Sequence, residues 1–112
     1  MLNGIVCPIN NLFFLSIGAS GADSEGFFDS NHWEVEAQRE LMARANKVVL
    51  LLDASKFNKR DMVFVAPWDK VDYLVTDAPP EAAGGKELAA MLRRAGVQVV
   101  VAANEEQAVK IL

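Results

Sequence analysis

An acid, a hydroxyl and an amine follow an apolar run in the stretch "KVVLLLDASKF" (47–57). Asp53 can accept a hydrogen bond from a sugar hydroxyl, and Lys56 can pair with a phosphate group as a point charge. The simpler interpretation is that Asp53 and Ser55 only cap the turn after the strand, as such residues often do. The stretch therefore predicts an anion site or a capped turn, and this stretch alone leaves both open.

A glycine-rich stretch, "GASG" (18–21), provides a second set of groups that could contact an anion. Glycine at 18 and 21 allows backbone N–H groups to approach a ligand closely, and Ser20 adds a hydroxyl donor. The stretch lacks both the Gly-Lys-Ser/Thr of a P-loop and the G-x-G-x-x-G spacing of a dinucleotide site. It indicates a phosphate-cradling turn, with an ordinary tight turn as the alternative.

The elements that must position these groups are predicted from apolar runs and helix signals. Four apolar runs predict strands, at 11–18, 47–53, 71–77 and 97–102. Two helices are expected between them, at 31–46 and 86–96. Apolar strands that alternate with helices indicate an α/β fold, a Rossmann-like layered parallel sheet covered on both faces.

In such a sheet, ligands bind outside the carboxyl ends of the strands. Polar residues follow three of the predicted strands, in "SIGASG", "DASK" and "TDAPP". We therefore expect the effector-binding residues to lie together at one edge of the sheet. They are Gly18, Ser20, Gly21, Asp53, Ser55, Lys56 and Asp77.

The first predicted helix has a clear start. Asn31 is the expected N-cap, with Glu34 completing a capping box. Its i, i+4 stripe is expected to face the core, whereas Arg39 and Arg44 lie off it and should be solvated. The stripe consists of Trp33, Ala37, Leu41 and Ala45.

The remaining segments have weaker signals. Pro67 limits 62–68 to a short edge element, and Gly96 marks the end of the second helix. We expect 77–85 to be a loop. Asn104, with Gln107, is expected to cap a last short helix.

Composition excludes several classes of function. The chain has 112 residues, the length of one domain, and a net charge of −4 that argues against gripping nucleic acid. One Cys and one His are too few for a structural zinc site or a confident catalytic triad, and no cofactor is expected. The acidic residues near 23–29 fit no calcium-loop pattern. The apolar runs are too short for a membrane span and no secretion signal is visible, so a cytoplasmic location is expected.

Taken together and in order, several stretches resemble the C-terminal sensor domain of the DeoR family of bacterial transcriptional regulators. They are "LFFLSIGASG", "GFFDSN", "EAQRELMARANKVVLLLDASKF", "VAPWDKVDYLVTD" and "LRRAGVQVVVA", within about 11–101. The resemblance implies a ribose-phosphate-isomerase and CoA-transferase-like fold that senses a phosphorylated sugar or related metabolite. In the family, effector binding changes how a helix-turn-helix holds DNA, generally in repressors of sugar-metabolism genes. Lys56 of the matching D-x-S-K-F motif is the implied ligand contact, with Asp53 beside it.

The chain also departs from the family pattern. Asn11 replaces a usual aspartate, Gln38 a common lysine, and Asn58 a usual glycine, although Asn tolerates left-handed backbone. The helix-turn-helix and the first half of the sensor domain have no counterpart, so we expect 1–112 to form one partial effector-binding domain. It would make no direct nucleic-acid contact and insert in no membrane.

Three alternatives to a non-enzymatic sensor remain open. A sugar-phosphate isomerase would use Asp53 as its base and Lys56 to hold phosphate, but no second acid–base group is placed. A phosphoacceptor receiver domain would use Asp53, but this chain lacks the other residues that this class requires. A truncated fragment that folds would bind nothing, and its open sheet edge would favour homo-oligomers.

Overall fold

A computed structural model of the chain describes residues 5–9 and 12–102, and from residue 13 on it also describes the side chains. Five strands form the main sheet in the order β1-β2-β5-β7-β8. Their bounds are Ile5–Ile9 (β1), Leu12–Gly18 (β2), Lys47–Leu51 (β5), Tyr73–Thr76 (β7) and Gln98–Val101 (β8). β1 pairs antiparallel with β2, whereas β2, β5, β7 and β8 are parallel. The expected α/β class with a parallel sheet is confirmed.

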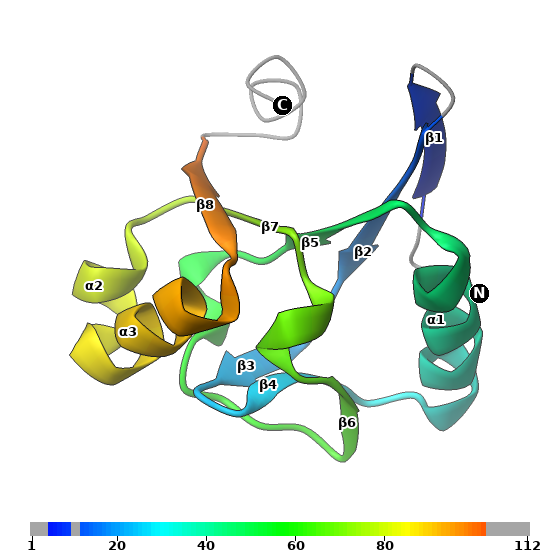
Figure 1. Cartoon of the computed structure of the whole chain (residues 1–112). Helices are drawn as coiled ribbons and strands as arrows, with labels where there is room; N and C mark the ends of the chain where they lie inside the picture. The colour runs from blue at the N-terminus through cyan, green and yellow to red at the C-terminus, as the bar shows by residue number, and fades with distance from the viewer. Residues whose placement is uncertain (1–4, 10–11, 103–112) are drawn as a thin grey trace.

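A second, smaller sheet was not expected from the sequence. It has the order β3-β4-β6, and its strands are antiparallel. Their bounds are Gly21–Asp23 (β3), Gly26–Asp29 (β4) and Val63–Ala66 (β6). Figure 1 shows these strands below the main sheet, between α1 on the right and the helices α2 and α3 on the left.

Three α-helices and two 3₁₀ turns complete the described chain. The α-helices are α1 (His32–Arg44), α2 (Pro80–Ala83) and α3 (Gly85–Ala95). The 3₁₀ turns are η1 (Ala54–Lys56) and η2 (Trp68–Lys70). The predicted loop at 77–85 thus contains a four-residue helix, because Pro80 starts a helical turn readily at its first position. The last expected helix, with Asn104 and Gln107, lies outside the described residues.

The described helices lie on one face of the main sheet. The expectation that both faces are covered stays a prediction, since Val49, Val75 and Val100 on the opposite face are at most 7% exposed. The connections β2 to β5, β5 to β7 and β7 to β8 all step the same way across the sheet. Because parallel crossovers are nearly always right-handed, such connections pass over the same face. That face meets Val35 of α1, Leu88 and Leu92 of α3, and Trp68 in the larger core. The opposite face forms a smaller apolar cluster made of Val49, Val75 and Val100 with Ala102.

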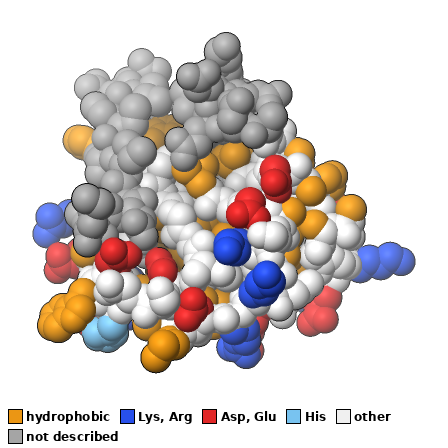
Figure 2. Space-filling view, turned by 180° about the vertical axis from the view of Figure 1, so that it is seen from behind, with side chains coloured by type: hydrophobic (Ala, Val, Ile, Leu, Met, Phe, Trp, Pro, Cys, Tyr) orange, Lys and Arg blue, Asp and Glu red, His pale blue; other side chains and the backbone are white. Residues whose placement is uncertain are grey.

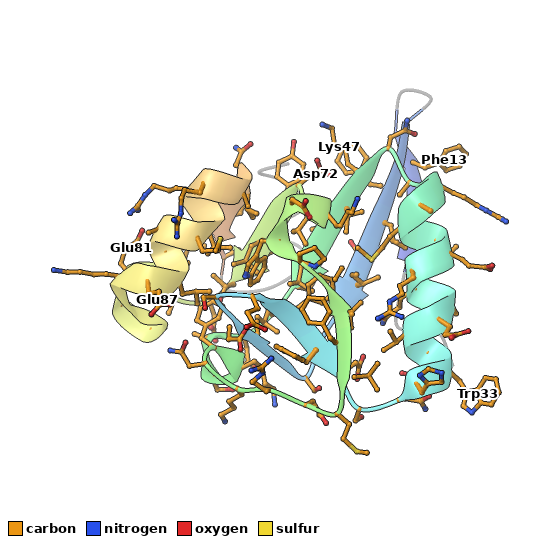
Figure 3. All side chains as sticks on the ribbon, turned by 60° about the horizontal axis from the view of Figure 1, so that its bottom comes forward. Phe13, Trp33, Lys47, Asp72, Glu81 and Glu87 are labelled. Atoms are coloured by element: carbon orange, nitrogen blue, oxygen red, sulfur yellow. The ribbon has the colours of Figure 1, made fainter. Side chains whose placement is uncertain are left out.

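The predicted start of α1 is confirmed. Its predicted core stripe is correct for Leu41 and Ala45, which pack against the core, but wrong for Trp33. Asn31 Oδ1 accepts hydrogen bonds from the backbone N–H groups of Trp33 and Glu34, at 3.0 and 3.2 Å. The Trp33 side chain is 82% exposed and projects away from the sheet (Figure 3). The buried positions of α1 are instead Val35 and Gln38, because the helix meets the sheet along a line one to two residues further round.

Other local signals hold. Gly96 ends α3 in the left-handed conformation, with φ of 79°, and Asn58 adopts φ of 61°.

Trp68 is 2% exposed and donates its indole N–H to the Asp23 carbonyl at 2.7 Å, so it is a core residue. At the amino ends of the parallel strands, Asp72 accepts a hydrogen bond from the Val48 N–H at 2.8 Å and lies 4.0 Å from Lys47 (Figure 3).

Candidate functional site

The turn after β5 is a capped 3₁₀ turn. Asp53 Oδ1 accepts a hydrogen bond from the Ser55 N–H at 2.9 Å and a second one from the Ser55 hydroxyl. The Ser55 hydroxyl, followed by the Ser55 N–H, lowers the pKa of Asp53, and the nearby Lys56 and Lys59 lower it further. The capping interpretation of Asp53 and Ser55 is therefore confirmed. A structural cap does not prevent ligand contact, so their role in binding stays a prediction.

Asp77 joins the carboxyl ends of two neighbouring strands. It follows β7, and its Oδ1 accepts a hydrogen bond from the Ala54 N–H in η1 at 2.8 Å. The backbone N–H of Leu52 also donates to the Val75 carbonyl at 2.9 Å. These bonds fix the start of the 53–56 turn to β7, so the structure brings Asp53, Ser55, Lys56 and Asp77 together at one edge of the sheet.

The glycine-rich stretch is tied to the far end of the same loop. Ser20 Oγ donates to Asp61 at 2.7 Å, and this bond lowers the pKa of Asp61. Asn58 N–H donates to the Ala22 carbonyl at 2.6 Å, so β3 runs beside the segment that follows η1. The Ser20 hydroxyl thus already has a partner within the protein and helps to hold the 53–61 loop, while its role in effector binding stays a prediction.

The two glycines of this stretch differ. A Cβ on Gly21 would collide with the Lys59 carbonyl group, its carbon atom being 2.9 Å away. Gly21 therefore permits a close approach of two backbone segments, a packing role that the sequence did not indicate. Gly18 pairs with Leu51 at the end of β2, and a Cβ there would meet only the Leu51 carbonyl oxygen at 3.8 Å. Gly18 is the glycine whose surroundings leave room for a guest.

Lys56 is the cation that the loop leaves available. It ends η1, its side chain is half-buried, and it forms no ion pair with any residue in the part of the chain that the structure describes. Lys59 lies in the same loop and is exposed. Both ammonium groups act on the Asp53 carboxylate, so the loop concentrates positive charge near it. Sequence reasoning missed Lys59, although its spacing of three residues from Lys56 was the available signal.

Other candidates for chemistry remain dispersed. His32 is exposed and lies 3.4 Å from Glu36 within the first turns of α1. Figure 2 shows basic and acidic side chains interspersed on one face of the molecule, without a continuous basic surface on that face. Within 5–9 and 12–102, no cluster of three or more His, Cys, Asp or Glu side chains could hold a metal ion. The described helices are all too short or too polar to cross a membrane.

Comparison with known proteins gives this geometry its context. The family model described as the DeoR C-terminal sensor domain matches residues 10–78, which include β2, α1, the 53–61 loop and β7. The chain belongs to this family of DeoR sensor domains. The resemblance seen in the ordered motifs is thereby confirmed, and the chain is a sensor module of the kind found in transcriptional regulators.

Similar proteins include several transcriptional regulators. The sensor domain is 37% identical over 70 residues to the "Glycerol-3-phosphate regulon repressor" of Escherichia coli (strain K12), covering 62% of this chain and 28% of that protein. It is 32% identical over 91 residues to the HTH-type transcriptional regulator GlpR of Haloferax volcanii, covering 80% of this chain and 34% of that protein. It is 32% identical over 71 residues to the HTH-type transcriptional regulator IolR of Bacillus subtilis (strain 168), covering 63% and 28%.

The matched region thus spans about a third or less of the length of these relatives. No solved structure is significantly similar to the chain. The relatives are regulators, and the family match covers the loop that presents Lys56.

Proposed function

We propose that this sensor domain binds a phosphorylated sugar or a related small phosphorylated metabolite, and that Lys56 contacts the phosphate. The observation that supports this most is Lys56, a half-buried residue that has no ion pair among the described residues although its loop is held at both ends. A fixed loop loses little conformational entropy on binding, so more of the charge interaction appears as affinity.

The groups around Lys56 could also contact the effector, and none of them forms an ion pair with the lysine. The Asp53 carboxylate is already occupied by two hydrogen bonds from Ser55, and its other oxygen can accept from a sugar hydroxyl. Gly18 leaves space at the end of β2, and Lys59 adds a second positive charge to the same loop. One relative is named a glycerol-3-phosphate regulon repressor, which favours a small polyol phosphate as effector.

The module would act by binding and not by turnover. An aldose–ketose isomerase needs a base that moves a proton between two neighbouring carbons and an acid that serves the carbonyl oxygen. The candidate base Asp53 is held in the ionised state with a lowered pKa and two hydrogen bonds, which makes it a poor proton acceptor. We infer an effector-sensing role within a cytoplasmic transcriptional repressor of sugar-metabolism genes, with DNA contacts made by other parts of such regulators.

Thermal-shift measurements with paired probes test the proposal. Ribose 5-phosphate and glycerol 3-phosphate are expected to stabilise the protein, and ribose, glycerol and inorganic phosphate to stabilise it less. A ligand at 100 times its dissociation constant should add about 2.7 kcal/mol to the free energy of unfolding. Lys56→Ala should remove the effect, and Lys86→Ala, an exposed lysine in the first turn of α3, should retain it. If no phosphorylated probe stabilises the wild type at millimolar concentration, the domain is not a sugar-phosphate sensor.

A further inference from the structure

A pocket lies between α1 and the segment that runs from β6 into η2, apart from the residues around Lys56. It has a volume of about 480 Å³. Its walls are Arg39, Met42 and Ala43 on α1, and 65–67 with Lys70 on the other side. It shares no residue with the proposed effector-binding set, and its volume lies within the range of small-ligand sites.

Arg39 is an exposed residue whose guanidinium group is hydrogen-bonded to the backbone of β6 at this pocket. Its Nε donates to the Val65 carbonyl at 2.9 Å, and its Nη2 donates to the Phe64 carbonyl. These two donors form one edge of the planar guanidinium group, which has five N–H groups in all. One N–H on Nη2 and both on Nη1 remain, including the forward-facing pair that can grip a carboxylate with two parallel bonds. Arg39 is exposed, as expected from the sequence, but it also binds the backbone of β6, which the sequence did not indicate.

The second cation of the pocket is Lys70, at the end of η2. Among the described residues it forms no ion pair, and none of the described residues that line the pocket is acidic. The remaining lining is apolar, from Met42, Ala43 and 65–67. The pocket thus combines two positive groups with an apolar wall.

We propose that this pocket is a second ligand site, which binds a small carboxylate with an apolar body. The fixed fork of Arg39 matches the two oxygens of a carboxylate, and Lys70 adds charge from the opposite wall. An apolar lining favours a hydrocarbon or aromatic body over a fully hydrated polyol phosphate, whose hydroxyl groups would be left without partners there. The domain would then respond to two chemically different metabolites at two separate sites.

Benzoate and its neutral analogue benzamide provide the test, followed by ¹H–¹⁵N NMR of the whole chain. Benzoate is expected to shift the backbone signals of Ala43, Val65, Ala66 and Lys70 in a saturable manner. Benzamide is expected to bind at least about tenfold more weakly, because it is neutral and loses a charge-assisted contact. Equal binding of both compounds, or benzoate shifts confined to the 53–61 loop, would overturn the proposal. If the signals of these four pocket residues change with protein concentration in the absence of benzoate, a second copy of the chain occupies the pocket and the proposal is overturned too.

Variants at Lys70 separate charge from folding, because Lys70 is exposed and its side chain forms no hydrogen bond or ion pair with the other described residues. Lys70→Ala should weaken benzoate binding about threefold, as expected for a partly exposed charge, and Lys70→Glu should weaken it further. Lys86→Ala is the matched control and should bind as the wild type. Arg39→Lys keeps the charge but loses the paired N–H groups of the guanidinium, so it should bind benzoate weakly. Its thermal unfolding shows whether the loss of the hydrogen bonds to β6 also weakens the fold. Wild-type affinity in Lys70→Glu would contradict the assignment.

Discussion

Gln38 is fully buried in the contact between α1 and the core, with 0% of its surface exposed. Neither its amide nitrogen nor its amide oxygen has a hydrogen-bond partner among the described residues. A buried polar group without a partner loses its bonds to water and destabilises the folded state by about 1–3 kcal/mol. Gln38 is thus a position where an apolar side chain of similar size should fit better.

We expect Gln38→Met to raise the free energy of unfolding by about 1–2 kcal/mol, because it removes two unpaired polar atoms while preserving volume. Urea denaturation measures the change. Gln98→Met, at an exposed position of β8, is the control and should alter stability by less than about 0.5 kcal/mol. A loss of stability in Gln38→Met would mean that a buried partner, such as water, satisfies the amide.

The free energy of unfolding should depend on pH through the Asp53 carboxylate. The Ser55 hydroxyl and N–H, together with Lys56 and Lys59, lower its pKa in the folded protein. A group with a lowered folded-state pKa contributes stability above its unfolded pKa, and the contribution is lost as the pH falls through the folded value. Asp53→Ala should therefore destabilise the protein at pH 7 by at most about 1 kcal/mol, since the carboxylate is exposed.

The pH series decides this prediction. Thermal or urea unfolding of wild type and Asp53→Ala should show a gap that is constant from pH 7 to about pH 5 and closes towards pH 3, below the ordinary aspartate pKa. Asp61, whose pKa the Ser20 hydroxyl lowers, should behave in the same way. A gap that widens as the pH falls would contradict the capping account.

The stability of the protein should depend on glycine at position 21 more than at position 18. Gly21→Ala would push a methyl group against the backbone of Lys59. Backbone atoms cannot move aside as easily as the end of a flexible side chain. We expect it to destabilise the protein by about 1–3 kcal/mol, as overpacking does. Gly18→Ala, where the nearest atom is 3.8 Å away, should change stability by less than about 1 kcal/mol. Equal effects in urea denaturation would show that the two backbone segments are not in close contact.

The long elements could be predicted because their signals are local. The apolar runs at 11–18 and 47–53 become β2 and β5, and the Asn31 cap fixes the start of α1. The second sheet could not be predicted so easily. β3 and β4 have three and four residues, and they are strands because Phe27 and Phe28 pair with β6, which lies far along the chain.

The candidate site was predictable only in part. The carboxyl-end rule brought Asp53 and Asp77 together correctly, since it depends on strand direction alone. It could not show that the Ser20 hydroxyl and Gly21 serve the loop itself, because those contacts join residues about forty positions apart. The orientation of α1 was likewise set by packing, so Trp33 proved exposed and Arg39 became bound to β6.

The molecule as a whole has a main sheet with two end strands, β1 and β8. Val101 on β8 is 45% exposed, and an exposed edge strand readily pairs with another chain. We expect the domain to form homo-oligomers through β8, and Val101→Lys to shift the population towards monomer in sedimentation equilibrium. Met62→Lys alters an apolar residue that is 88% exposed outside the sheet and should leave the distribution unchanged. A wild type that is monomeric throughout would exclude this association.

We propose above all that Lys56, presented by a loop fixed at both ends, receives the phosphate of the effector. The most direct measurement is the ¹H–¹⁵N NMR spectrum during titration with ribose 5-phosphate, for wild type and Lys56→Ala. We expect saturable shifts at Gly18 and in the 53–59 loop of the wild type, and none in the variant although its spectrum shows an intact fold. Shifts of equal size in Lys56→Ala, or shifts that leave this loop untouched, would contradict it.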